Sequence, residues 1–219
     1  MKTVMTNKEY EKALEIRICK LNIYKKQTFN MAAKIIGNTL LKEDLFFCAS
    51  ADRCVHLIDG MCELLKTRNL TCVGALLRLQ MDNCMRIYAA FIAADKDKVV
   101  DCLISDNSIN KEMSKDGHKL SDAYLKTELN NLDSKFASVY NQASGFIHLS
   151  SKAFYQSVTG CDGNGISFQV GGELPEKLNN SLLEACDAFL HFIHLHHEML
   201  QAVADSKERY DAKYDDCES

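Results

Sequence analysis

Tyr140, Ser144 and His148 are spaced four residues apart in one segment of the chain. Positions four apart in a helix differ by only about 40° around the axis, so the three side chains would share one face. An imidazole titrates close to neutral pH, which makes His148 a candidate general acid or base. Ser144 is a candidate nucleophile, although no Gly-x-Ser-x-Gly elbow surrounds it. The alternative interpretation is a set of buried, hydrogen-bonded side chains with a structural role.

Arg78 and Asp82 have the same spacing within a run that is otherwise almost wholly apolar. An arginine four residues before an acid is the less favourable order for an ion pair along a helix. We therefore expect the Arg78 guanidinium to contact another helix, as a structural clamp or as part of a catalytic site. The two polar sets can satisfy each other, so Arg78 and Asp82 are expected to converge with the Tyr140, Ser144 and His148 side chains.

The last helical pattern carries a third group of candidate ligands. His191, His194 and Glu198 fall on one stripe of this helix. Imidazole and carboxylate groups three and four residues apart can bind a transition metal, as in metalloproteins built from helical bundles. No second Glu-x-x-His motif is present on another helix, so a solvated polar face is the competing interpretation. His196 falls instead on the apolar side and is expected in the core or in an interface.

The elements that must position these residues are mostly helices. One Pro and ten Gly in 219 residues leave few enforced breaks, which favours long helices. The run from Thr71 to Phe91 is apolar nearly all round and is expected to be central. A capping box at Thr6–Glu9 starts the first helical pattern, which covers residues 6–36. Further helices are predicted over residues 43–66 and 71–91 and, as a short helix, after Asp95. The last two patterns cover residues 121–149, with a break near Asn130–Asn131, and Pro175 to at least Ala204.

Residues 153–170 change to an alternating pattern around a Gly-rich turn at 160–165, which predicts a β-hairpin. Two strands alone are marginally stable, so we expect the hairpin to pack against the bundle. The turn precedes a strand and lacks the Gly-Lys-Ser/Thr ending of a phosphate loop, so no cofactor is expected there. The sequence predicts a mainly α, single-domain bundle of about five or six helices over residues 1–219, with fraying at 1–6 and 206–219.

Composition limits the partners and the compartment. A net charge of −4 and a pI near 6.0 give no general attraction to DNA or to an anionic membrane. Ten cysteines without a Cys-x-x-Cys motif, most of them inside apolar helical runs, indicate buried thiols in a reducing compartment. No signal-like segment and no long uninterrupted apolar stretch is present, so a cytoplasmic, membrane-free protein is expected.

Leu77-Arg78-x-x-x-Asp82 on a central helix, combined with Tyr140-x-x-x-Ser144-x-x-x-His148, resembles a HEPN-like family of all-helical bacterial proteins of uncharacterised function. The later hairpin and closing helix also resemble that family, over roughly residues 40–205. Its members usually carry Glu where this chain has the shorter Asp82. The resemblance implies a HEPN-like bundle that pairs as a dimer, a link to phage defence or abortive infection, and action on RNA or nucleotides.

HEPN ribonucleases carry an Arg-x4–6-His motif, and this chain departs from it. The positions that would carry the Arg before His148 read Asn141-Gln-Ala-Ser144 and contain no Arg, and Arg53-Cys-Val-His56 has too short a spacing. One function therefore requires Arg78 to supply the cation that stabilises phosphate charge, with His148 as the acid or base. The alternative is a non-catalytic dimeric interaction module in which the same residues form a buried network. A metal-binding protein that uses the C-terminal histidines is a third reading.

Overall fold

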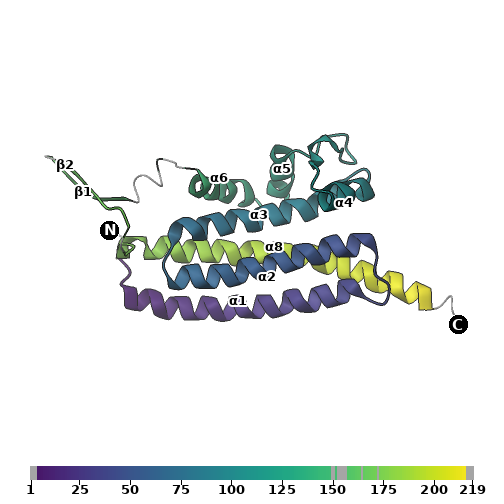
Figure 1. The fold of residues 1–219 in the computed structure, drawn as a ribbon, viewed down its shortest axis with the longest axis horizontal. Coiled ribbons are helices and arrows are strands. Elements are labelled where there is room, and N and C mark those ends of the chain that lie inside the picture. The colour runs from purple at the N-terminus through teal and green to yellow at the C-terminus, as the bar shows by residue number, and fades with distance from the viewer. Residues whose placement is uncertain (1–3, 149–150, 152–156, 164, 172, 216–219) are drawn as a thin grey trace.

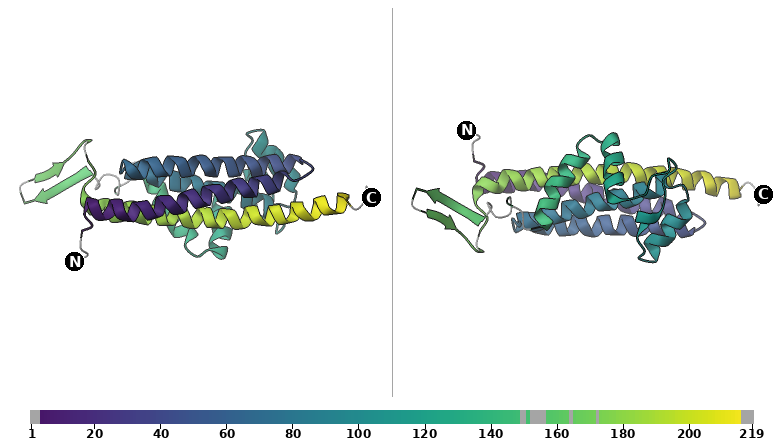
Figure 2. Two further views of the ribbon diagram at one scale, coloured as in Figure 1. Left: turned by 90° about the horizontal axis from the view of Figure 1, so that it is seen from below. Right: turned by 90° about the horizontal axis from the view of Figure 1, so that it is seen from above.

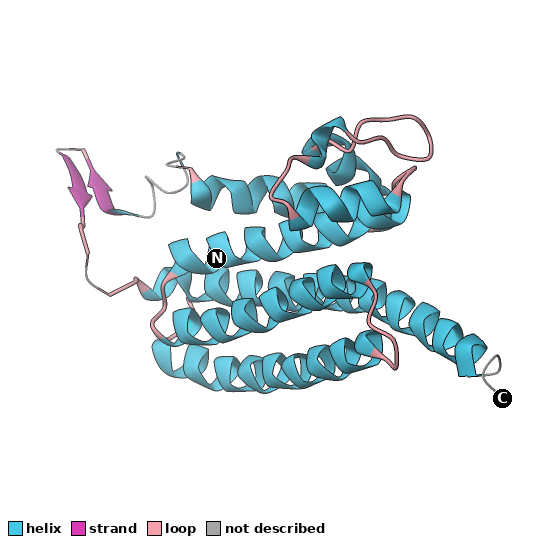
Figure 3. Cartoon of the chain, turned by 45° about the vertical axis from the view of Figure 1, so that its right-hand side comes forward, coloured by secondary structure: helices cyan, strands magenta, loops and turns pink. Residues whose placement is uncertain are grey.

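The described part of the computed structural model comprises all residues except 1–3, 149–150, 152–156, 164, 172 and 216–219. These residues form seven α-helices, two short 3-10 helices and one antiparallel hairpin (Figures 1 and 3). The predicted mainly α single domain is confirmed. One helix more than expected is present because the break predicted in residues 121–149 separates two helices.

Four long helices build the bundle: α1 (Asn7–Ile36), α2 (Lys42–Lys66), α3 (Leu70–Ile92) and α8 (Asn179–Asp215). α1 packs on α2 and α8, and α3 packs on the same two helices from the other side (Figures 1 and 2). Apolar side chains at helical spacing fill the space between them, with Leu21, Met81 and Phe189 fully buried. The bundle therefore has one continuous core.

Local chemistry explains where α1 begins and ends. The Thr6 hydroxyl accepts a hydrogen bond from the Glu9 N–H (3.3 Å), and the Glu9 carboxylate accepts one from the Thr6 N–H (2.8 Å). Gly37 ends the helix at φ +54°, a left-handed conformation that favours glycine. A Cβ atom on Gly37 would also overlap with Asp211, so the close approach of α8 requires glycine here.

Three shorter helices cover the outer side of α3: α4 (Lys96–Ile104), α5 (Asp122–Leu132) and α6 (Phe136–Ile147). This arrangement explains why the α3 sequence is apolar nearly all round. The break between α5 and α6 lies after Leu132, slightly later than predicted. Asn130 is still helical, and its side-chain oxygen accepts a hydrogen bond from the Ala137 N–H (3.0 Å), which supports the start of α6.

The hairpin forms as predicted, from β1 (Val158–Asp162) and β2 (Gly165–Phe168), but its expected packing on the bundle is wrong. All four β2 residues are exposed, and the sheet projects beyond one end of the bundle (Figures 1 and 2). The core is already closed by the four long helices, which leaves the apolar side chains of β2 no place in it. The predicted positions 153–156 lie outside the described residues.

The end of α8 also differs from its expected fraying after Asp205. Pro175 precedes a short 3-10 helix, η2 (Glu176–Leu178), and α8 then continues to Asp215. Lys207 and Asp211 are buried against the connection between α1 and α2. The charged tail is therefore ordered through these contacts, while residues 216–219 lie outside the described part.

Gly74 sets the distance between α3 and α6, because a Cβ atom there would overlap with the Phe146 ring. Ala is the better helix former by about 1 kcal/mol. We nevertheless expect Gly74→Ala to lower the free energy of unfolding by about 1–3 kcal/mol through overpacking. Chemical denaturation should measure the loss. The matched control is Gly60→Ala, whose new Cβ would lie 3.1 Å from the flexible tip of Leu76 and should cost little; equal effects of the two changes would contradict the packing argument.

Candidate functional site

Arg78 joins α3 to α6. Its Nη2 donates to the Tyr140 hydroxyl, its Nε donates to Ser144 Oγ at 3.4 Å, and its Nη1 pairs with the Asp82 carboxylate. The guanidinium carbon also lies 3.6 Å from the centroid of the Tyr140 ring, within the range of a cation–π contact. The Arg78 side chain is only 12% exposed and that of Asp82 is 25% exposed. Four of the five residues that were predicted to converge therefore meet.

Tyr140 and Ser144 are both engaged within this cluster. Ser144 Oγ donates to the Tyr140 carbonyl oxygen one turn earlier (2.8 Å). Burial raises the pKa of Tyr140, partly offset by the charge of Arg78, so the phenol stays protonated near neutral pH. The hydroxyl of Ser144 thus has a backbone acceptor and an arginine donor, and none of its described hydrogen bonds is to a histidine base.

His148 is placed apart from the other four. α6 ends at Ile147, and His148 has extended backbone angles (φ −101°, ψ 144°). The helical spacing therefore stops one residue too early to hold its side chain on the face of Tyr140 and Ser144. The residue is exposed, and its described contact is the backbone hydrogen bond from its N–H to the Ser144 carbonyl (3.3 Å).

On α8, the two histidines of the candidate metal site pair with different carboxylates. His191 pairs with Asp133 at the junction of α5 and α6. The His194 imidazole lies 3.6 Å from the Glu198 carboxylate, and both side chains are mostly exposed. Within the described residues, no three His, Cys, Asp or Glu side chains are grouped to hold a metal ion. This face of α8 is best described as a solvated polar surface.

A polar layer inside the core involves all four long helices. His196 Nε2 lies 2.9 Å from Ser50 Oγ, and Ser50 in turn donates to the Asn83 side-chain oxygen (2.8 Å). The neighbouring His197 contacts the Thr28 hydroxyl at 2.7 Å. Burial lowers the pKa of His196 to about 3 and that of His197 to about 4. The apolar side predicted for His196 is confirmed, but its polar partners come from distant segments that no local pattern identifies.

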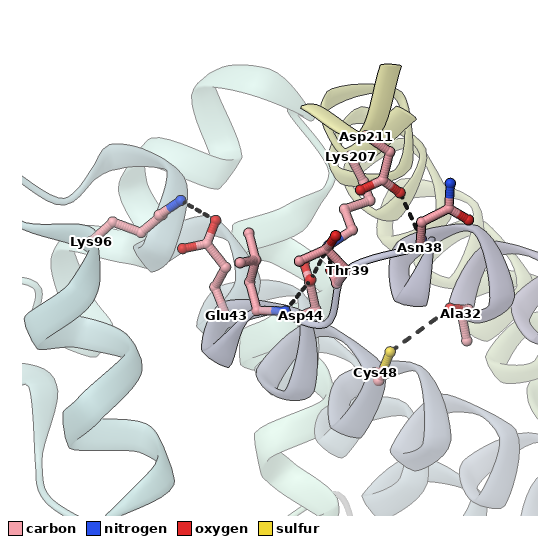
Figure 4. A network of polar contacts seen from close by, with 10 residues as sticks. Ala32, Asn38, Thr39, Glu43, Asp44, Cys48, Lys96, Lys207 and Asp211 are labelled. Atoms are coloured by element: carbon pink, nitrogen blue, oxygen red, sulfur yellow. Dashed lines mark hydrogen bonds and ion pairs between the residues drawn. The ribbon is translucent and has the colours of Figure 1, made fainter. Parts of the chain in front are cut away.

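A buried ion pair was also missed by sequence reasoning (Figure 4). Lys207 Nζ lies 2.6 Å from the Asp44 carboxylate, with side chains 2% and 4% exposed, and it also donates to the Thr39 carbonyl. Asp211 accepts a hydrogen bond from the Asn38 N–H (2.8 Å). Lys207 and Asp211 continue the helical spacing of the buried positions on α8, and this spacing could have predicted that both are buried.

No family model, curated protein or solved structure matches this chain. Among the helices in the described ranges, none has the length and apolar character needed to cross a membrane. The fold and the Arg78 cluster define a helical-bundle protein with a guanidinium held between two helices.

Removing the Tyr140 hydroxyl tests how strongly the cluster holds α6. Tyr140→Phe leaves one nitrogen of a nearly buried guanidinium without its acceptor, so we expect a loss of about 1–3 kcal/mol in the free energy of unfolding. Urea denaturation measures this loss. Tyr88→Phe is the control, since that half-buried hydroxyl makes no described hydrogen bond. An equal loss in Tyr88→Phe and Tyr140→Phe would mean that the hydrogen bond to Arg78 adds no measurable stability.

Proposed function

We propose that the protein is a non-catalytic helical interaction module that pairs with a second copy of itself. The observation that carries this proposal is that each guanidinium nitrogen of Arg78 faces a side chain of its own protein. Nη2 and Nε donate to Tyr140 and Ser144, whereas Nη1 forms an ion pair with Asp82 without a described hydrogen bond.

A catalytic arginine stabilises developing negative charge with N–H groups that point at the reacting atoms. The Arg78 nitrogens point at side chains of its own protein, and 88% of the side chain is covered (12% exposed). His148, the other residue that catalysis would need, is exposed and not in described contact with the guanidinium. This geometry supports a clamp between α3 and α6.

A second copy is the partner that we propose, on the outer face of α1. Ile16 and Ile23 lie two turns apart on that face and are 58% and 52% exposed. α1 has 30 residues and is therefore about 45 Å long, enough for an extended helix–helix contact. Dimer formation is also what the HEPN-like resemblance implies.

Sedimentation analysis over a wide range of protein concentration tests the pairing. We expect a concentration-dependent dimer in the wild type and a monomer in the double variant Ile16→Glu, Ile23→Glu. Leu132→Glu is the matched control, because Leu132 is a similarly exposed apolar residue (65%) on α5. A wild type that stays monomeric throughout, or a double variant that dimerises as well as the control, would refute the proposal.

RNA or nucleotide processing, with the link to phage defence that the resemblance implies, is the second candidate. It is favoured by the meeting of Arg78, Asp82, Tyr140 and Ser144 one turn before His148. The test is cleavage of total RNA and tRNA by the wild type and by His148→Ala, after both are shown to melt alike. Cleavage that disappears only in the folded variant would replace the interaction module with an enzyme, whereas inactivity of both supports the module.

A further inference from the structure

A pocket of about 440 Å³ lies where the start of α2, the end of α3, the start of α4 and the last part of α8 meet. Its size falls in the range of about 300–1,000 Å³ that is typical of small-molecule sites. It is separate from the Arg78 cluster, and Figure 4 shows the side of it that Lys96, Glu43, Asp44 and Lys207 form.

One wall of this pocket is apolar. Phe47 and Phe91 contribute aromatic rings whose centroids are 6.2 Å apart, and Val203 lines the same cavity from α8. Ala90 near the end of α3 and Ala93 and Ala94 directly after it line the pocket between these larger side chains. Such a wall favours the hydrocarbon part of a ligand, because apolar surface is removed from water on binding.

The charged residues of the pocket carry an excess of positive charge. Three lysines line it, against the two carboxylates of Glu43 and Asp44. Lys96 is paired with Glu43 (2.7 Å), and Lys207 is paired with Asp44 (2.6 Å). In two other pockets of the described residues, carboxylates equal or outnumber the lysine and arginine side chains. On a chain of net charge −4, a pocket with excess cations is selective for an anion.

Lys115 is the lysine of this pocket that makes no described ion pair. Its Nζ donates to the Phe91 carbonyl at the end of α3 (3.0 Å). The loop is fixed in this position by backbone hydrogen bonds from Lys115 to Ile92 (2.9 Å) and from Ala94 to Met113 (2.9 Å). An ammonium group has three N–H donors, so Lys115 retains donors for a second acceptor at the mouth of the pocket.

We infer that this pocket binds a small amphiphilic carboxylate. Its hydrocarbon chain lies against Phe47, Phe91 and Val203, and its carboxylate accepts hydrogen bonds from Lys115. The inference is independent of the proposed pairing through α1, since the two sites share no residue.

Calorimetric titration with octanoate tests the site, and 1-octanol serves as the neutral ligand of the same chain length. We expect saturable binding of octanoate, weaker binding of octanol, and a loss of about tenfold in octanoate affinity for Lys115→Met. Lys111→Met is the control, because Lys111 is exposed on the same connection but does not line the pocket. Ala94→Phe places a ring at the exposed rim and should abolish binding while the fold is retained.

Each remaining outcome overturns the inference. Absence of saturable octanoate binding to the wild type rejects the site, and unchanged binding to folded Ala94→Phe places the ligand elsewhere. Equal affinity for octanol and octanoate, or equal losses for Lys115→Met and Lys111→Met, rejects recognition of the carboxylate.

Discussion

Lys207→Met is expected to lower the free energy of unfolding by about 3–5 kcal/mol. The change removes the ammonium group but leaves the Asp44 carboxylate buried, with only the Leu41 N–H (2.8 Å) as a remaining described donor. A carboxylate that is 4% exposed is poorly hydrated, so the loss of its cation is not compensated by water. Urea denaturation, followed by circular dichroism at neutral pH, measures the effect.

Two further variants isolate the cause. Lys213→Met removes an exposed lysine less than two turns further along α8 and should leave the stability unchanged within about 0.5 kcal/mol. The double variant Lys207→Met, Asp44→Leu removes both charges and should recover part of the loss, because no unpaired charge remains in the interior. Recovery is incomplete because Asp44 also accepts the Leu41 N–H. A single variant as stable as the wild type would show that the pair is not buried in solution.

Acid should destabilise the fold through His196 and His197 before the carboxylates begin to titrate. Burial holds the pKa of His196 at about 3 and that of His197 at about 4, whereas an unfolded histidine titrates near 6.5. Below pH 6.5 the unfolded chain therefore binds protons that the native state excludes, and the free energy of unfolding falls with falling pH. The expected loss between pH 7 and pH 5 is roughly 2 kcal/mol for each imidazole, and it continues until the pH passes the native pKa values.

The surroundings of the two rings explain why the native state excludes these protons. The side chains that contact them, from Ser50, Asn83 and Thr28, are neutral and supply no negative charge to an imidazolium. Urea denaturation at pH 7, 6 and 5 should show about half of the wild-type pH dependence in His196→Gln. His56→Gln, which alters an exposed histidine, should keep the full dependence. The same pH dependence in His196→Gln and the wild type would mean that other groups cause it.

The Arg78 cluster shows which parts of the site can be predicted from residue spacing within single helices. An arginine in an apolar run must find partners, and the spacing of Tyr140 and Ser144 identified the helix face that supplies them. The same spacing failed at His148, because helical periodicity holds only while the helix continues and α6 ends at Ile147. The prediction of a metal site on α8 was also limited to one helix. Residues that share one face of a helix do not show whether a second helix supplies further ligands.

The sequence by itself determined the class of the fold and most helix boundaries, because caps, helical spacing and the scarcity of Pro and Gly act within a few residues. Thr6, Gly37 and Asp95 each mark a boundary in this way. Only the tertiary structure decided that the hairpin stands away from the bundle and that Lys207 meets Asp44. These outcomes depend on which surfaces remain free after the long helices pack, and partners more than a hundred residues apart leave no local pattern in the chain.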